Sequence, residues 1–190
     1  MAPKIVGFSA SLRNARDREG SRRLVADILE LPDEAALFAY LEQQGNTHLE
    51  HFCRAGRDQG IPFDQLYKEL RKLGGRQGLS NSEVCLAAAL WGASRLGADV
   101  EHIPLPEHFL ADGGTKYLDE LKASLLSADG IVVASPVYFG DRSSLSQRLI
   151  SFMGEDPELS AGMGGRIYGG VTVGAKRNGG QETALIYQMH

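Results

Sequence analysis

One stretch of the sequence combines residue types that suit a flat ligand. The segment ASPVYFGD (134–141) follows the apolar run GIVV (130–133) directly. Proline pins the backbone, glycine permits close approach, and aromatic rings offer flat apolar surface. A planar heteroaromatic ring could lie against such a loop, which comprises Pro136, Val137, Tyr138, Phe139 and Gly140. The same composition also suits a strand end whose two aromatic side chains fold into the core.

A second group of residues could bind an anion. Ser9, Ser11 and Arg13 follow the apolar run Lys4–Phe8, and Ser80, Asn81 and Ser82 open a helical pattern far along the chain. Serine hydroxyls and the free N–H groups of a helix N-terminus suit a phosphate, to which an arginine adds positive charge. The pattern Ser80-x-x-Glu83 is also a capping box, which explains this helix start without any ligand. The two interpretations are compatible.

A third candidate segment follows the apolar run Ile167–Val173. It contains Gly174, Ala175, Lys176, Arg177, Gly179 and Gly180. Glycines and cations at the end of a strand predict a flexible loop that is rich in hydrogen-bond donors. A surface turn has the same composition and remains the alternative.

Strands and helices must bring these three segments together. Short runs rich in Val and Ile predict buried strands at Lys4–Phe8, Asp99–Ile103, Gly130–Ala134 and Ile167–Val173. Helical periodicity lies between them, in Asn81–Leu96, in Thr115–Ser127 and around Leu145, Leu149 and Met153. Alternating strands and helices predict an α/β fold with a parallel sheet. Ligands of such sheets bind outside the carboxyl ends of the strands, where the three segments should converge.

Residues 14–78 interrupt this alternation. Helices are predicted at Arg22–Leu31, Glu34–Gln43 and Phe63–Leu73, with breaks at Pro32, Gly45-Asn46, Gly60, Pro62 and Gly74-Gly75. We interpret residues 14–78 as a helical insertion in the loop that joins the first strand to its helix. Residues 1–190 then form a single domain.

Composition excludes several classes of protein. With 43% hydrophobic and 23% charged residues and a net charge of −4, nothing suggests a nucleic-acid or anionic membrane partner. With only two widely spaced cysteines we expect no disulfide framework, and the spacing of His48, His51 and Cys53 lacks a fourth ligand, so no metal site is expected. Neither a signal peptide nor a membrane-spanning run is visible, and we expect a cytoplasmic protein.

Taken together, the three segments resemble the flavodoxin-like NAD(P)H-dependent FMN reductases, a family that includes quinone and chromate reductases. GFSASLR with the displaced SNS is similar to the family's phosphate loop, ASPVYFG to its isoalloxazine loop, and GAKRNGGQET to a third family motif. The resemblance covers Lys4–Arg13 and Leu79–Thr183. It implies a doubly wound parallel sheet of order 2-1-3-4.

The resemblance also implies FMN as the cofactor. Its phosphate would be held by Ser9, Ser11, Arg13, Ser80, Asn81 and Ser82, its ring and ribityl chain by Pro136 to Gly140, and the other ring edge by Gly174 to Gly180. The expected reaction is hydride transfer from NADPH or NADH through the flavin to a small acceptor such as free flavin or a quinone. The flavin performs this chemistry, so no catalytic side chain is required. The alternatives are a non-catalytic FMN-binding electron carrier and an interaction protein that uses the insertion.

The sequence departs from the family pattern in several places. The phosphate loop is split, Ala175 replaces a glycine, and Asp141 stands where a small residue is usual. The compact cysteine motif of related iron–sulfur flavoproteins is absent. The sequence stops at His190, where flavodoxin-like folds continue through a fifth strand, and we therefore expect a C-terminally incomplete domain. Its unpaired apolar edge strand would favour a homo-oligomer.

Overall fold

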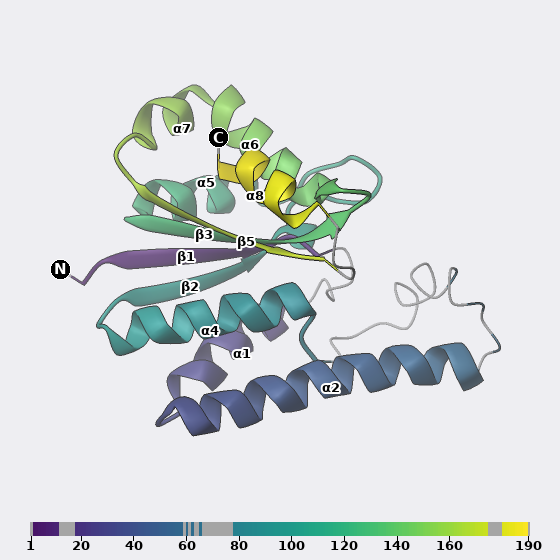
Figure 1. Cartoon of the computed structure of the whole chain (residues 1–190). Coiled ribbons are helices and arrows are strands. Elements are labelled where there is room, and N and C mark those ends of the chain that lie inside the picture. Colours follow the sequence, from purple (N-terminus) through teal and green to yellow (C-terminus); the bar gives the residue numbers. More distant parts are fainter. Residues whose placement is uncertain are drawn as a thin grey trace.

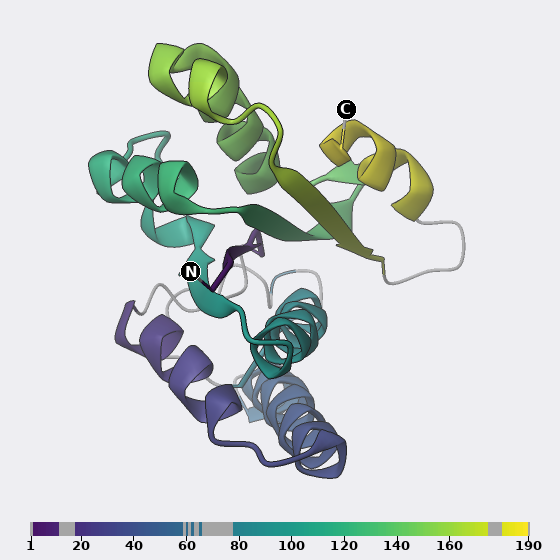
Figure 2. The same ribbon diagram turned by 90° about the vertical axis from the view of Figure 1, so that its left-hand side faces the viewer.

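The computed structural model has an α/β architecture with helices on both faces of one sheet (Figures 1 and 2). It describes residues 2–11, 18–58, 60, 62, 65, 78–174 and 180–189. The strands are β1 (Lys4–Ser9), β2 (Asp99–Pro104), β3 (Gly130–Tyr138), the short β4 (Asp141–Arg142) and β5 (Ile167–Val173). β1 pairs in parallel with β2 and β3, and β3 pairs in parallel with β5. The predicted order 2-1-3-4 is therefore confirmed, with β5 as the predicted fourth strand.

Two layers of helices cover the sheet. One face carries α1 (Arg18–Leu29), α2 (Glu34–Asp58) and α4 (Asn81–Arg95), and the other carries α5 (Leu118–Ser127), α6 (Ser144–Glu155), α7 (Pro157–Gly162) and α8 (Gln181–Met189) (Figure 2). A short 3-10 helix, η1 (Leu105–Glu107), follows β2. No helix in the described part of the chain is long and apolar enough to cross a membrane.

Each face of the sheet has its own apolar core. Phe8, Val133 and Leu149 belong to the core between the sheet and the α5, α6 and α7 layer. Leu86 and Leu90 of α4 belong to the core on the opposite face. That second core includes side chains from the predicted insertion, namely Leu24 and Ile28 of α1 and Leu37 and Leu41 of α2. The first part of residues 14–78 thus shares a core with α4 and β2.

β3 continues beyond Ala134, where the prediction ended it. Pro136 pairs with Val173 of β5, so the expected loop is strand as far as Tyr138. The carbonyl of Ala134 points towards β1, because it accepts a hydrogen bond from Ala10 at 2.9 Å. Pro136 lies two residues further and faces the same side, where the pairing with β1 has already ended at Ser9. Its missing N–H therefore costs no bond of the ladder.

Two helix boundaries were also predicted wrongly. α2 runs through Gly45 and Asn46 to Asp58, because Gly45 faces α4, where its Cβ would lie 3.9 Å from Val84. Tertiary packing outweighs the cost of about 1 kcal/mol that a glycine adds inside a helix. α5 begins only at Leu118, since Thr115 is paired with Phe109 in an isolated bridge. The predicted helix Phe63–Leu73 lies, apart from residue 65, outside the described residues.

Candidate functional site

The candidate phosphate-binding residues gather where β1 ends and α4 begins. Ser80 is the N-cap of α4, and its hydroxyl accepts a hydrogen bond from the backbone N–H of Glu83. The carboxylate of Glu83 in turn accepts the N–H of Ser80 at 3.2 Å. The capping box predicted from the sequence is therefore confirmed. Ser9, Ser11, Ser80 and Ser82 are buried, whereas Asn81 is exposed and Arg13 lies outside the described residues.

A histidine that the sequence analysis did not single out connects the two parts of this junction. Nε2 of His102, on β2, lies 3.0 Å from the hydroxyl oxygen of Ser9 and 3.9 Å from Oε1 of Glu83. All three side chains are buried. The alternation of β2 could have placed His102 on the inner face, because Val100 and His102 share one side of the strand. The search for site residues after the strand ends overlooked it.

Serine, histidine and glutamate together raise the question of a hydrolytic triad. In such a triad the carboxylate and the serine bond to opposite ring nitrogens of the histidine. Here Glu83 and Ser9 both face Nε2 of His102. This geometry is that of a structural relay and not of an activated nucleophile.

The predicted ring-binding segment forms a tight hairpin. Val137 pairs with Arg142 and Tyr138 with Asp141 in antiparallel register, which leaves Phe139 and Gly140 as the two-residue turn. Their φ angles of 55° and 85° are both positive, as a type I′ turn requires. The ring of Phe139 is fully exposed and that of Tyr138 is half-buried. The alternative in which both aromatics fold into the core is therefore wrong for Phe139.

The third segment meets this hairpin. A Cβ on Gly180 would lie 2.5 Å from the carbonyl oxygen of Gly140, so the two backbones are in direct contact. Gly174 packs against the side chain of Gln181, and Thr172 donates a hydrogen bond of 2.9 Å to the carbonyl of Gln181. The structure thus brings together both described ends of the segment and the hairpin. Ala175, Lys176, Arg177 and Gly179 lie outside the described residues.

Buried polar side chains hold the base of the hairpin. The backbone N–H of Ser143 donates to the hydroxyl of Ser135 at 3.0 Å, and the hydroxyl of Ser146 donates to Gln188 at 3.3 Å. The amide of Gln188 donates to the carbonyl of Val133 at 2.6 Å, which ties α8 to the centre of β3. Because such networks stabilise a single arrangement, the residues on either side of the hairpin are held rigidly.

The neighbouring Tyr168 adds no ionisable group to the site. Burial raises the pKa of its phenol above the ordinary value of 10.0, against smaller opposing effects from a hydrogen bond with Gln188 and from the charge of Arg142. Tyr168 is therefore neutral at physiological pH. Arg142 itself lies over the ring of Tyr187, with 5.7 Å between the guanidinium carbon and the ring centre.

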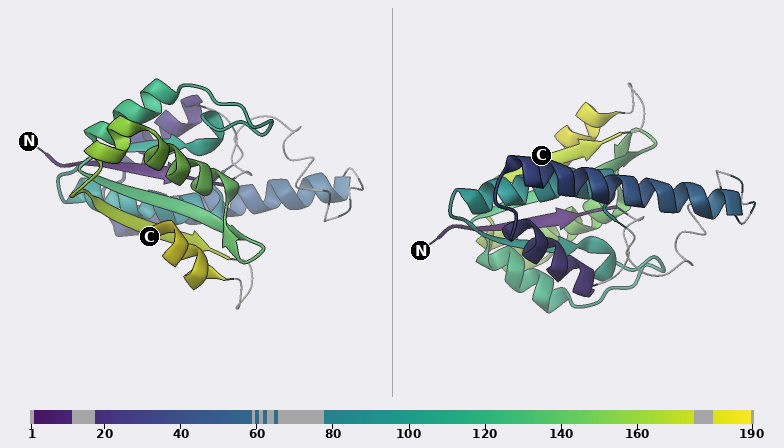
Figure 3. Two further views of the ribbon diagram at one scale, coloured as in Figure 1. Left: turned by 90° about the horizontal axis from the view of Figure 1, so that it is seen from above. Right: turned by 90° about the horizontal axis from the view of Figure 1, so that it is seen from below.

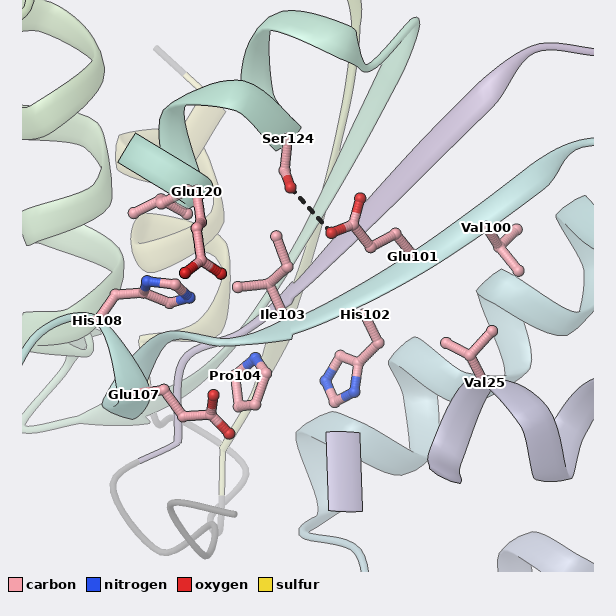
Figure 4. Close-up of a pocket in the computed structure, with 11 residues that line it drawn as sticks. Val25, Val100, Glu101, His102, Ile103, Pro104, Glu107, His108, Glu120 and Ser124 are labelled. Atoms are coloured by element: carbon pink, nitrogen blue, oxygen red, sulfur yellow. Dashed lines mark hydrogen bonds between the residues drawn. The ribbon is translucent and has the colours of Figure 1, made fainter. Parts of the chain in front are cut away.

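A cavity of about 310 Å³ runs along the outer edge of β2 (Figure 4). Glu101 and His102 of β2 line it, together with Val25 of α1 and Ser124 of α5. Ser124 donates a hydrogen bond of 2.8 Å to Glu101 inside the cavity. His102 thus separates this cavity from Ser9. Among the described residues, no group of three or more His, Cys, Asp or Glu side chains could hold a metal ion.

Comparisons with known proteins identify similar sequences. The model of the NADPH-dependent FMN reductase family matches residues 74–186, which is more than half of the chain. An iron–sulfur flavoprotein of Methanocaldococcus jannaschii is 43% identical over 75 residues, which cover 38% of this chain and 37% of that protein. A second one from the same organism is 33% identical over 72 residues, or 36% and 35% of the two chains. The matches therefore span little more than a third of each relative's length.

Proposed function

Because the chain belongs to the NADPH-dependent FMN reductase family, we propose that it is an FMN-binding oxidoreductase. In this proposal it transfers a hydride from NADPH or NADH to a small acceptor, such as free flavin or a quinone. When bound, FMN supplies the redox chemistry itself. The task of the chain is then to bind the flavin, orient its ring and leave one ring face accessible to donor and acceptor.

The observation that carries the proposal is the contact between Gly140 and Gly180. It brings the hairpin Tyr138–Asp141 and the start of α8 to one place at the carboxyl ends of β3 and β5. Ligands of open parallel sheets bind at this edge. Among the described residues no apolar side chain covers the exposed ring of Phe139, and a planar heteroaromatic ring offers a matching surface. We propose that residues 136–140 and 174–180 border the flavin ring.

The other end of the ligand would lie at the junction of β1 and α4. Backbone N–H groups in the first turn of α4, with Ser9, Ser11, Ser80 and Ser82, provide hydrogen-bond donors for a phosphate. Glu83 brings a carboxylate close to this point, so a compensating cation is needed. We propose Arg13 for that role.

The distance between the two halves fits the shape of FMN. Ser9 pairs with Ala134, and Tyr138 lies four residues further along extended β3. At roughly 3.3 Å per residue this separation is about 13 Å. The ribityl chain lies between phosphate and ring, and the ribityl chain and the width of the isoalloxazine ring together can span such a gap. The chain's residues therefore fit this cofactor at both of its ends.

An iron–sulfur cluster does not carry over to this chain in our proposal. Both matched relatives are named iron–sulfur flavoproteins. A cluster held by cysteines needs four thiolates, and these 190 residues contain only Cys53 and Cys85. We propose that electrons pass through the flavin without a cluster held by this chain's own cysteines.

The test is to purify the protein with added FMN, record its absorbance spectrum after gel filtration and follow NADPH consumption. We expect bound flavin and steady turnover with a quinone or free flavin as acceptor. Bound flavin without turnover would instead support the electron carrier. A protein that retains no flavin and shows no saturable FMN titration would contradict the proposal.

A further inference from the structure

Three buried side chains meet at one ring nitrogen close to the proposed phosphate site. Glu83 opens α4, His102 lies on β2, and Ser9 ends β1 (His102 and the β2 edge are seen in Figure 4). Nε2 of His102 stands between the other two, 3.9 Å from Oε1 of Glu83 and 3.0 Å from Oγ of Ser9. Because all three are buried, their hydrogen-bond directions are set by neighbouring protein groups and not by bulk water.

The hydroxyl of Ser9 has a single hydrogen, which it can donate only once. If Nε2 of His102 carries no hydrogen, Ser9 donates to it and has nothing left for an anion. If Nε2 carries a hydrogen, it donates to Ser9, whose own hydrogen is then turned away from His102. Since a phosphate oxygen only accepts, the second arrangement alone lets Ser9 bind phosphate.

Glu83 decides between these two arrangements. A carboxylate near Nε2 attracts an N–H there and repels a lone pair. It therefore favours the tautomer in which Nε2 carries the hydrogen. The same carboxylate already accepts the backbone N–H of Ser80, which fixes its position at the start of α4.

We propose that Glu83 and His102 are positioning residues that keep the hydroxyl hydrogen of Ser9 directed at the FMN phosphate. This inference rests on the proposed function, since it requires the phosphate to lie at the junction of β1 and α4.

The proposal and simple charge repulsion predict opposite effects of a Glu83 substitution on FMN affinity. Glu83→Gln keeps the capping box, because glutamine at this position makes the same hydrogen bond, but it removes the negative charge. Charge repulsion alone would make the variant bind FMN more tightly. The relay predicts weaker binding, because Nε2 of His102 is no longer held in the donating form.

The experiment compares the dissociation constants of FMN and riboflavin, which lacks the phosphate, for the wild type and three variants. We expect Glu83→Gln to weaken FMN several-fold and His102→Leu to weaken it by about tenfold, with riboflavin unchanged. His102→Gln should restore most of the loss, because its amide nitrogen can donate to Ser9. Circular dichroism melting confirms that each variant is folded.

A second measurement needs no ligand. The ¹⁵N shifts of the His102 ring show which nitrogen carries hydrogen, and we expect a protonated Nε2 in the wild type and a changed distribution in Glu83→Gln. An unprotonated Nε2 in the wild type, equal losses for both ligands, or tighter FMN binding by Glu83→Gln would each overturn the relay. If the wild type binds FMN no better than riboflavin, the proposed phosphate site fails and the relay fails with it.

Discussion

Gly180 rests directly on the backbone of Gly140, so that a Cβ on Gly180 would lie 2.5 Å from the Gly140 carbonyl oxygen and 2.7 Å from its Cα. Two segments that are forty residues apart in the chain thus share one contact, which leaves no room for a side chain. The φ angle of Gly180, +76°, independently favours glycine. The contact fixes the start of α8 relative to the hairpin that carries Phe139.

Gly180→Ala should therefore displace the hairpin. We expect a lower melting temperature, because alanine in the left-handed region costs about 1–2 kcal/mol before any clash is counted. FMN affinity, measured by fluorescence titration, should fall by about tenfold or more. Gly154→Ala is the matched control, since Gly154 lies in α6 with nothing near its Cβ position. That variant should be at least as stable as the wild type, and equal effects of both substitutions would contradict the prediction.

Phe139→Asn should separate stability from binding. Phe139 has a φ angle of +55° and a fully exposed ring, so its strain is not offset by packing within the described chain. Asparagine before Gly140 is the favoured type I′ pair and should raise the free energy of unfolding by about 0.5–1 kcal/mol. FMN affinity should fall, because the ring surface is lost. A variant that binds FMN as tightly as the wild type would show that Phe139 does not contact the flavin.

Arg166 should be among the side chains most important for stability. Its guanidinium donates to the carbonyls of Leu125, Leu126 and Ala128 at the C-terminal end of α5, and to Gly162 of α7. We expect Arg166→Ala to lower the free energy of urea unfolding by about 2–3 kcal/mol, because several partly buried carbonyls lose a charged donor. Arg166→Lys should recover only part of this, since an ammonium cannot match the planar donor geometry. Arg54→Ala, in an exposed part of α2, should have no effect.

Acid should weaken the cap of α7. Asp156 accepts hydrogen bonds from Lys122 at 2.8 Å and from the N–H groups of Glu158 and Leu159 at 3.0 Å. The hydrogen bond with Lys122, followed by the backbone bond from Leu159, lowers the pKa of Asp156 below its ordinary value of 3.8. A lowered pKa in the folded state means that the stabilisation is complete above the ordinary value and is lost as the pH falls through the lowered one.

The control for this prediction is Asp156→Asn, which can still cap α7 but carries no charge. The stability difference between wild type and variant should be constant near neutral pH and should shrink below about pH 4. Urea unfolding at a series of pH values measures it. A difference that does not change between neutral and acidic pH would exclude the ion pair as its cause.

We expect the fold to survive deletion of the distal part of the insertion but not deletion of the whole insertion. The distal half of α2 extends away from the sheet (Figure 3), yet the N–H of Leu79 donates to the carbonyl of Gln44 at 3.3 Å. A short Gly/Ser link from Gly45 to Gly78 therefore joins two points that are already neighbours. We expect this variant to keep a cooperative melting transition and to bind FMN.

Removal of the whole of residues 14–78 is the contrasting variant. It would also remove Leu24, Ile28 and Leu37, which cover Leu86 and Leu90 of α4. Each uncovered leucine loses about 1.5–3 kcal/mol of burial, so we expect the fold to be lost. A cooperative transition in this larger deletion would show that residues 14–78 are not required for the fold of the sheet domain.

Local sequence determined the elements that depend on near neighbours. The Val- and Ile-rich runs predicted the four parallel strands, because buried strands need continuous apolar residues, whereas their order was implied by the family resemblance. Ser80 and Glu83 predicted the start of α4, since both partners of a capping box lie within one helical turn. The serines, aromatics and glycines of the candidate site could also be recognised from the sequence, because the residues of each segment are close neighbours in the chain.

The tertiary structure decided whatever depends on a distant partner. β3 continues through Pro136 because β5 lies on one side and β1 has ended on the other, and α2 continues through Gly45 because α4 packs against it. In the sequence, His102 is an ordinary strand residue. Only the folded structure shows that β1 and α4 bring Ser9 and Glu83 close to the same ring nitrogen. Such contacts join residues 19 to 93 positions apart, as for His102 with Glu83 and with Ser9. A local pattern has no information about them, because their energy exists only when the folded chain closes the loops between them.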